Sequence, residues 1–518
     1  MITTLHKYRF NNSWLGDLSV ALNLLSFHVL RQRNGIFAYQ EKIPTKLKGV
    51  EQADGFLIVR EPLGLGEWAL GIKDHRKYFD SETGDPIKQS EQVLFGGNPQ
   101  KYPRPLERIK SCARLGTKLG EVLDGFTGDS LAPDSFERKV HEKNHLVTRS
   151  GQVPINPSIG RLLKFNGFLK CPTNLELIIL ADEPDNSVVR QYAANMERGF
   201  RNYGFQGKVI PQSFDVGLRM TEKNLSKHSV GLIALSGNRG SVLHPKELAV
   251  MEHLDRCGVP YRMFSMNNSE LFWSSLDQVG ALVMLAGGIP YRMNLNWQEG
   301  RPIYSVGVDV GHPLHVGDSK LAVSLMAPDG EHLNTFVCAQ KRDETADQNN
   351  LFHMLRETSE LAKEHAGTQQ VEFLVLRDGR RNPGESLSGY LNNLSSQMTL
   401  VDVSKRVNAY AYSPYSFAPG SCGDVLHFNK GEATLAITAP SATVDQIPML
   451  RKIRIDKGWD GLQLGREKVA EVICSMAFSP ALGFKPHGNP GPVYWADGAA
   501  SISSENCHFR GIKQITIK

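Results

Sequence analysis

The chain has 518 residues, with 59 Lys and Arg against 54 Asp and Glu and a formal net charge of +5. Hydrophobic residues make up 41% and charged residues 22%, a composition typical of globular proteins that bury several cores. A chain of this length predicts about two to four domains. The mild basic excess alone does not indicate a nucleic-acid binder, since clustering of charge decides that question.

The cysteines and the apolar runs exclude several classes of protein. The seven cysteines are scattered and form no C-x-x-C pair, so we expect reduced thiols and neither a disulfide framework nor a zinc site. No stretch approaches the roughly 18–20 apolar residues of a membrane span. The opening MITTLHKYRF lacks the apolar run of a signal peptide. We therefore expect a cytoplasmic protein that does not enter a membrane.

Residues 1–165 predict a smaller, irregular α/β region. Residues 17–35 fit an amphipathic helix that ends at Asn34-Gly35. Two short strands and a second helix are expected at residues 55–62, 67–72 and 106–125. The region is either one irregular domain or a docking surface for a partner.

Residues 166–295 show strands that alternate with helices. The expected order is strand, helix, strand, helix, strand, at residues 175–182, 188–204, 228–237, 245–258 and 259–265. This alternation predicts a doubly wound, Rossmann-like parallel sheet. Gly237-Asn238-Arg239-Gly240 precedes a helix whose N-terminus could bind an anion. It is not a G-x-G-x-x-G fingerprint, so a dinucleotide site is not expected.

Residues 296–518 predict a third unit. Strands are expected at residues 303–312, twice within 320–340, at 371–379 and at 399–407, with helices at 349–367 and 467–479 and a closing strand-to-helix passage at 491–501. The order β-β-β-α-β-α is that of an RNase H-like fold.

Asp309 and Asp378 each end an apolar strand of this unit. Ligands sit at the carboxyl ends of parallel strands, where close carboxylates raise one another's pKa unless a divalent cation binds between them. Two cations about 3.5–4 Å apart can stabilise the displacement at a phosphodiester. A lone strand-end aspartate is more often a turn or cap residue. The segments VGVDVGHP, VLRDGRR and VYWADGAA, occurring in this order, favour the metal site.

Taken together, these segments resemble the Argonaute/Piwi family over about residues 170–518. SVGVDVGHPLHVGDSKLAVSLMAPDGEHL, LVLRDGRRNPGESLSGYL, VDVSKRVNAYAYS and PVYWADGAAS are similar to successive PIWI-domain segments, and CGVPYRMFSMNN and MLAGGIPYRMN to the end of a MID domain. The resemblance implies a Rossmann-like MID domain at 166–295 and an RNase H-like PIWI domain at 296–518.

The resemblance also implies roles for the acids. Asp309 matches the first catalytic acid, Asp378 the third and Asp497 the fourth metal-ligand position. The family's second acid is a glutamate midway between the first and third, which falls on Glu344, with Asp343 and Asp347 close by. Asp309, Asp378 and Asp497 would then bind Mg²⁺ or Mn²⁺.

The family anchors the guide's 5′ end in the MID domain with an aromatic residue or His, a Lys, a Gln and a further Lys. This sequence departs from that pattern, because Arg262 stands where the Gln is expected and MLAGG lacks the Lys. Arg239, Lys246 and Arg262 are the candidates for holding a phosphate. A guide with a 5′-hydroxyl end, or a pocket built differently, is the alternative.

Basic side chains that flank strands of the last unit are candidates for contacts to the nucleic-acid backbone. They are Arg380, Arg381, Lys405, Arg406, Arg451, Lys452 and Arg454. Ordinary solvated surface is the competing interpretation. No feature distinguishes RNA from DNA for guide or target.

Residues 1–165 are too few for the N-terminal, linker and PAZ domains of full-length family members. The chain thus resembles a short prokaryotic-type Argonaute without PAZ. The first hypothesis is a guide-directed, metal-dependent endonuclease that cleaves complementary target strands in host defence. The alternative is a catalytically silent sensor that activates an effector protein docked on residues 1–165.

Overall fold

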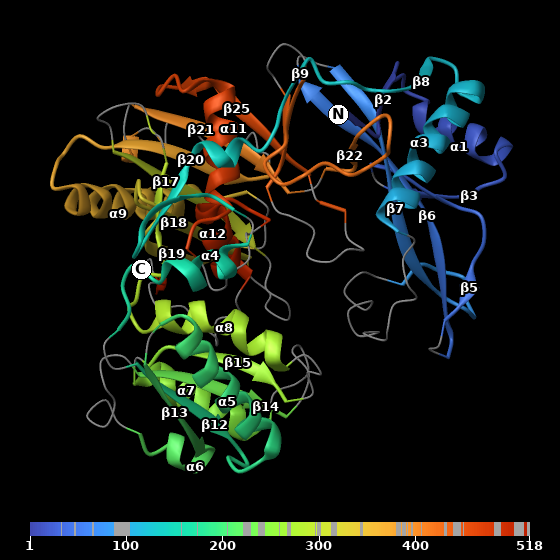
Figure 1. Cartoon of the computed structure of the whole chain (residues 1–518). Helices are drawn as coiled ribbons and strands as arrows, with labels where there is room; N and C mark the ends of the chain where they lie inside the picture. The colour runs from blue at the N-terminus through green and yellow to red at the C-terminus, as the bar shows by residue number, and fades with distance from the viewer. Residues whose placement is uncertain are drawn as a thin grey trace. The chain divides into compact units, whose positions relative to one another are not determined.

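The computed structural model divides into two compact units (Figure 1). Unit 1 comprises Met1–Val140 and Ser404–Arg454, and unit 2 comprises His141–Val403 and Ile455–Lys518. The structure describes all residues except 33, 46–47, 65–66, 88–103, 157, 173–174, 205, 221–228, 237–243, 258, 267–270, 296, 298–301, 312–318, 342–344, 380–384, 386–389, 391, 395–396, 406, 429–432, 439–446, 449, 481–487, 502–511 and 515–518. These units cut the chain differently from the predicted domains, because unit 1 joins two stretches far apart in sequence.

An antiparallel sheet forms the N-terminal part of unit 1. Its strand order is β3-β4-β6-β7-β2-β8, with β5 paired to β6. The long hairpin of β6 (Val50–Gly64) and β7 (Glu67–Asp80) extends the two short strands expected there. The other strands are β2 (Leu5–Tyr8), β3 (His28–Gln32), β4 (Gly35–Tyr39), β5 (Ile43–Pro44) and β8 (Phe126–Ser130).

Helices α1 (Trp14–Leu24) and α3 (Pro105–Val122) share one apolar cluster with this sheet. Alternate strand residues face the helices because successive side chains of a strand point to opposite faces. The cluster includes Ile36, Ala38, Ile58, Leu70 and Ile72 from the strands and Leu18, Leu22, Ile109, Leu115 and Leu119 from the helices. The helix expected at residues 106–125 is thereby confirmed.

The helix expected at residues 17–35 is wrong in its second half. Helix α1 ends at Leu24, and Ser26 has a positive φ of 63° that breaks the helical path. The chain then continues as β3, which pairs with β4 so that Gln32 lies opposite Gly35. Asn34 therefore lies in the turn between β3 and β4, and Gly35 is the first residue of β4 instead of ending a helix.

The segment 404–454 completes unit 1. Its strands extend the N-terminal region: β22 (Ala411–Tyr412) pairs with β1 (Ile2–Thr3), and β23 (Val425–Phe428) pairs with β9 (Ser135–Glu137). Strands β24 (Ala433–Ile437) and β25 (Leu450–Asp460) follow β23 in the same sheet. The side chain of Glu61 accepts hydrogen bonds from both the backbone N–H and the side-chain amide of Asn408, at 3.0 and 2.9 Å.

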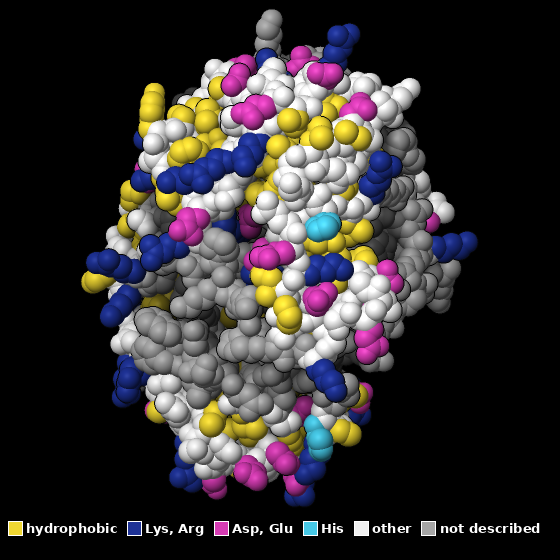
Figure 2. Space-filling view, turned by 90° about the vertical axis from the view of Figure 1, so that its right-hand side faces the viewer, with side chains coloured by type: hydrophobic (Ala, Val, Ile, Leu, Met, Phe, Trp, Pro, Cys, Tyr) yellow, Lys and Arg dark blue, Asp and Glu magenta, His cyan; other side chains and the backbone are white. Residues whose placement is uncertain are grey.

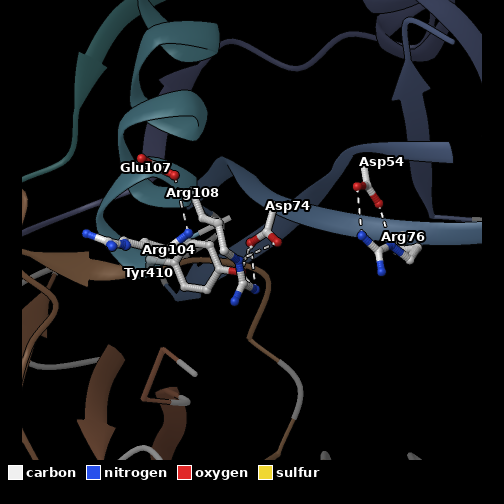
Figure 3. A network of polar contacts seen from close by, with 7 residues as sticks. All are labelled: Asp54, Asp74, Arg76, Arg104, Glu107, Arg108 and Tyr410. Carbon is white, nitrogen blue, oxygen red and sulfur yellow. Dashed lines mark hydrogen bonds and ion pairs between the residues drawn. The ribbon is translucent and has the colours of Figure 1, made fainter. Parts of the chain in front are cut away.

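A polar network links β7, α3 and the 404–454 segment (Figure 3). Arg108 of α3 donates two hydrogen bonds to the Asp74 carboxylate, at 2.8 and 3.1 Å, and Tyr410 donates its phenolic hydrogen to the same carboxylate. Burial and the Asp74 charge raise the pKa of Tyr410, so the phenol stays protonated and remains a donor. The side chains of Arg108 and Asp74 are only 15% and 14% exposed, so both charges depend on this pairing.

Replacing Asp74 with Asn should lower the free energy of unfolding by about 2 kcal/mol, because it leaves a largely buried guanidinium without its counter-charge. Urea unfolding monitored by tryptophan fluorescence measures the change. Asp185→Asn is the matched control, since its pair with Arg190 is exposed at both partners, and it should cost less than about 0.5 kcal/mol. Equal effects of the two substitutions would show that the network adds nothing to stability.

Unit 2 contains the predicted parallel sheet. Its strand order is β13-β12-β14-β15, and every pairing is parallel. The strands are β12 (Leu175–Ala181), β13 (Gly207–Ser213), β14 (Ser229–Leu235) and β15 (Tyr261–Ser265), with helices α5 (Ser187–Asn202), α6 (Phe214–Gly217), α7 (Pro245–Arg256) and α8 (Leu271–Leu285) (Figure 1). The alternation of strands and helices confirms the Rossmann-like prediction for this part of the chain.

A second sheet of unit 2 carries the predicted acids. Its order is β26-β19-β18-β17-β20-β21, followed by β25. The strands are β17 (Ile303–Gly311), β18 (Ser319–Met326), β19 (His332–Gln340), β20 (Glu372–Asp378), β21 (Met398–Ser404) and β26 (Ile512–Gln514). Strands β17, β18 and β19 form an antiparallel meander, and β20 then pairs parallel to β17, which confirms the RNase H-like order.

Helices α9 (Gln348–Ala366) and α12 (Gly491–Ser501) lie against opposite faces of this sheet. Val306 and Val308 of β17 share an apolar cluster with Leu351 and Met354 of α9, whereas the alternate residues of β17 face α12. Residues 491–501 are helical throughout, so the strand-to-helix passage expected there is wrong. The apolar run PVYW packs as a helical face because the helix lies directly on the sheet.

Six further elements complete the described secondary structure. They are β10 (His145–Thr148), β11 (Gly151–Pro154) and β16 (Arg292–Asn294), which form a small antiparallel sheet, together with η2 (Val140–Lys143), α4 (Ile159–Asn166) and α11 (Gly465–Met476). Within the described residues, no helix combines the length and the apolarity that a membrane span requires. Six of the seven cysteines carry free thiols, and Cys507 lies outside the described residues.

Candidate functional site

Three aspartates that are far apart in sequence meet at one edge of the second sheet of unit 2. Asp309 lies on β17, Asp378 is the last residue of β20, and Asp497 lies on α12. One carboxylate oxygen from each lies within 4.8 Å of the others. Asp309 is 6% exposed and the other two are half-buried. The structure thus brings together the three acids that the sequence singled out.

Parallel pairing places the first two acids side by side. Val308 of β17 is opposite Arg377 of β20, so the next residues in register are Asp309 and Asp378. Both side chains emerge on the α12 face, because residues alternate between the faces of a strand. The two carboxylates therefore follow from strand pairing alone.

The third acid is delivered by a helix that lies unusually close to β17. A Cβ added at Gly307 would overlap the Pro492 carbonyl, and one added at Gly311 would lie 2.5 Å from the Ala500 carbonyl oxygen. Ser324 of β18 donates a hydrogen bond to the Pro492 carbonyl at 2.5 Å. Because the two glycines flank Asp309 on the same face, α12 can rest on the strand backbone and bring Asp497 to Asp309.

The donor set fits a hard divalent cation. Carboxylate oxygens are the protein ligands that Mg²⁺ and Mn²⁺ prefer, and three converging carboxylates repel one another unless a cation neutralises them. Arg377, the neighbour of Asp378, pairs with Glu385 at 2.9 Å. The described part of the site thus combines a negative cluster, a buried member and oxygen ligands within reach of one ion.

Glu344, expected to be the second acid of the site, lies outside the described residues, as does Asp343. The chain beside them is fixed by Gln340, whose side chain donates to the Thr345 carbonyl at 2.9 Å and accepts from the Asp347 N–H at 3.0 Å. Asp347 accepts from the Asn350 N–H at 3.0 Å and is the N-cap of α9. Asp347 therefore serves as a capping residue.

The candidate residues for the guide's 5′ end are dispersed. Lys246, in the first turn of α7, pairs with Asp182 at 3.0 Å, and this hydrogen bond raises the pKa of Lys246. Arg262 is the second residue of β15 and lies toward the other end of the parallel sheet. Burial raises the pKa of Tyr494 on α12, and the positive charge of Arg262 offsets part of this increase. Arg239 lies outside the described residues.

A buried carboxylate that sequence reasoning missed lies beside the N-terminus of α7. Glu247 is 3% exposed, and its two oxygens accept from the N–H groups of Ser236 and His244, each at 2.8 Å. It also accepts from the Ser236 hydroxyl at 3.0 Å. The signal was available, because a Glu three residues after a helix cap is half of a capping box.

The basic side chains proposed to contact the nucleic-acid backbone differ in their exposure to solvent. Arg451 is 4% exposed and donates to the Lys405 carbonyl at 3.0 Å, and Lys452 pairs with Glu61 at 3.4 Å. Of the candidates among the described residues, Arg454 is exposed. Arg380, Arg381 and Arg406 lie outside the described residues. Burial makes Arg451 a structural residue, which corrects its assignment to the nucleic-acid backbone.

Figure 2 shows Lys and Arg side chains mixed with Asp and Glu on the face that it presents. The described side chains of this face form no large field of one sign, in keeping with a net charge of +5. Any phosphate contacts on this face therefore depend on individual side chains.

Replacing Asp378 with Asn should weaken Mn²⁺ binding at least about tenfold, because the change removes one charged oxygen donor of three. Isothermal titration calorimetry of the full chain measures the affinity. Asp215→Asn is the control, because Asp215 is an exposed residue of α6, which follows β13 of the parallel sheet. This variant should bind Mn²⁺ as tightly as the unsubstituted chain does. Equal affinity in all three proteins would exclude the triad as the metal centre.

No protein-family model matches the sequence, and no curated protein sequence matches it. Solved structures do match. Clostridium butyricum Argonaute, bound to a guide DNA and a 19-mer target DNA, aligns with a TM-score of 0.68 at 13% identity, over 93% of this chain and 84% of that one. Marinitoga piezophila Argonaute, in complex with 5′ OH guide RNA and target DNA, aligns at 0.67 and 12% identity, over 96% and 87%.

Drosophila Piwi aligns with a TM-score of 0.65 at 11% identity, over 95% of this chain and 83% of that chain. Matches of this extent include most of the first 165 residues, which are about a third of the chain. The N-terminal region is thus part of the shared architecture. The predicted resemblance is confirmed in the fold, and the chain has the MID–PIWI architecture of the Argonaute and Piwi proteins.

Proposed function

We propose that this chain is an Argonaute-type protein that binds a short guide nucleic acid and cleaves complementary target strands. The observation that carries the proposal is the convergence of Asp309, Asp378 and Asp497 within 4.8 Å. A binding protein that only positions a duplex has no need of three clustered carboxylates. Host defence in the cytoplasm is the role that this activity would serve.

In this proposal the three aspartates hold one or two Mg²⁺ or Mn²⁺ ions. Bound cations of this kind stabilise the attacking and leaving oxygens of a phosphodiester displacement. Asp309, the most buried of the three, anchors the site from the strand, while Asp378 and Asp497 close it from β20 and α12. Glu344 is the proposed second acid, and it directly precedes Thr345, whose carbonyl accepts a hydrogen bond from the Gln340 side chain.

Residues 166–295 would hold the guide's 5′ end, and residues 296–518 would hold its duplex with the target. We favour a guide with a 5′-hydroxyl, because the Glu247 carboxylate takes the N–H groups of Ser236 and His244 beside the start of α7. A 5′-phosphate placed there would meet a negative charge. Marinitoga piezophila Argonaute, similar in fold, was crystallised with a 5′ OH guide RNA.

Contacts to the nucleic-acid backbone would come from exposed cations. Arg454 is the strongest candidate among the described residues because it is exposed, whereas Lys405, at the other end of the 404–454 segment, is half-buried. Arg380, Arg381 and Arg406 complete the proposed set. Such contacts supply affinity that is independent of sequence and falls with salt.

The alternative function is a silent sensor that activates an effector protein. Helix α1 exposes Val20 and Leu24, at 60% and 69%, an arrangement suited to docking on unit 1. The two functions differ in one respect that can be measured, which is whether the isolated chain cuts its target.

Purified chain loaded with a guide should cut a complementary strand in the presence of Mn²⁺ and leave it intact with EDTA. RNA and DNA forms of guide and target are tested in all four combinations. The paired substitution Asp309→Ala with Asp378→Ala should abolish cutting while guide binding is retained. Absence of cutting in every combination, with guide and target bound, would favour the sensor.

Guide binding should discriminate between 5′ ends. We expect the chain to prefer a 5′-hydroxyl over a 5′-phosphate guide by about tenfold, measured by filter binding with end-labelled oligonucleotides of one sequence. Glu247→Gln should reduce this preference, because it removes the charge facing the phosphate. Glu252→Gln, exposed on the same helix, is the control and should leave the preference unchanged. Tighter binding of the phosphorylated guide by the unsubstituted chain would contradict the assignment.

A further inference from the structure

An ion pair is buried behind the aspartates, on the opposite face of the sheet. Arg377 and Glu385 are 3% and 1% exposed, and the guanidinium donates to both carboxylate oxygens, at 2.9 and 3.2 Å. Arg377 precedes Asp378 on β20, so its side chain points away from the α12 face and toward the α9 face.

Such a pair is expensive to bury. Removing two charges from water costs several kcal/mol each, and well-packed apolar side chains of similar volume often serve stability as well or better. Its surroundings are apolar, with Val308, Val375 and Tyr390 in the adjacent cluster. Stability alone therefore gives this pair no clear advantage over an apolar one.

Three further hydrogen bonds fix the pair to its surroundings. Arg377 donates a second type of hydrogen bond, from Nη1 to the Asp378 carbonyl at 2.8 Å, and so fixes the backbone from which that carboxylate projects. Glu385 accepts from the Ala346 N–H at 3.3 Å, just before α9, and from the Tyr390 hydroxyl at 3.4 Å. One buried carboxylate thus joins the end of β20 to the chain that leads into α9.

We propose that Glu385, acting through Arg377, is a positioning residue for the metal centre. The inference rests on the proposed metal-dependent function of the triad. The pair holds the Asp378 backbone at the end of β20 in register with Asp309, and it holds the entry to α9 against the same strand. Its role is to fix ligand geometry, and the surrounding apolar cluster supplies the stability.

The experiment separates geometry from stability with a double substitution. Arg377→Met with Glu385→Met replaces both charges with apolar side chains, so the fold should persist with a midpoint of thermal unfolding within about 3 °C of the unsubstituted chain. Mn²⁺ affinity should nevertheless fall about tenfold, as for other residues that orient metal ligands. Guide binding should be unchanged. A double variant with undiminished Mn²⁺ affinity would overturn the proposal.

Glu385→Asp keeps the charge and shortens the side chain by one methylene. If the double variant fails to fold, this variant tests whether the distance from the carboxylate to Arg377 determines Mn²⁺ binding. It should fold and should bind Mn²⁺ more weakly than the unsubstituted chain; equal binding would overturn the proposal. Glu471→Gln is the matched control. That carboxylate is also buried in unit 2, where it accepts from Asn144 and Lys468, and its loss should lower thermal stability without weakening Mn²⁺ binding.

Mn²⁺ binding is measured on the chain without nucleic acid, so this inference and the proposed cleavage fail separately. Unsubstituted chain that binds Mn²⁺ but cuts no target would refute cleavage and leave the positioning role to be decided by the variants. Unsubstituted chain that binds no Mn²⁺ would refute the metal centre and the positioning role together. Single-turnover cleavage, where present, should slow in parallel with the loss of Mn²⁺ affinity.

Discussion

The close contact between α12 and β17 is the constraint on which the site depends. Gly307 and Gly311 remove the side chains that would separate helix from strand, and Asp309 stands between them on the same face. A strand-pairing geometry alone brings only Asp309 and Asp378 together. The third carboxylate, that of Asp497, joins them because α12 can approach the backbone of β17. The pattern G-x-D-x-G thus provides both the ligand Asp309 and the space for the helix that carries Asp497.

The same strand separates two environments. The three carboxylates lie on its α12 side, where Asp309 is buried and Asp378 and Asp497 are half-buried, whereas its α9 side faces an apolar cluster beside the buried Arg377–Glu385 pair. Neighbouring residues along β20 thus serve opposite faces. Both faces share the backbone of β20. A shift of that backbone at Arg377 therefore also moves the Asp378 carboxylate on the other face.

Much of unit 2 could be predicted because its signals are local. Buried strands such as Leu175–Ala181 are continuous apolar runs, and acids at strand ends report on a sheet edge. Helix α12 was misjudged because an apolar run such as PVYW fits a buried helix as well as a strand. Arg451 was misjudged because a basic residue in a sequence carries no sign of its burial. In both cases the packing that decides the matter comes from residues far away in the chain.

Unit 1 could be predicted least, since its second segment, residues 404–454, comes from within the last predicted domain. Val407, Ala409 and Leu426 share an apolar cluster with Leu5 and Ala69 from the start of the chain. A fragment beginning near residue 141 would therefore keep the 404–454 segment but lose its apolar partners. The apolar surface exposed in this way would favour aggregation. Val403 and Ile455 belong to strands β21 and β25, which are neighbours in one sheet, with Thr399 bonded to Asp460 at 2.9 Å. Trimming this molecule for production would thus require two coordinated cuts and a short joining turn between those strands.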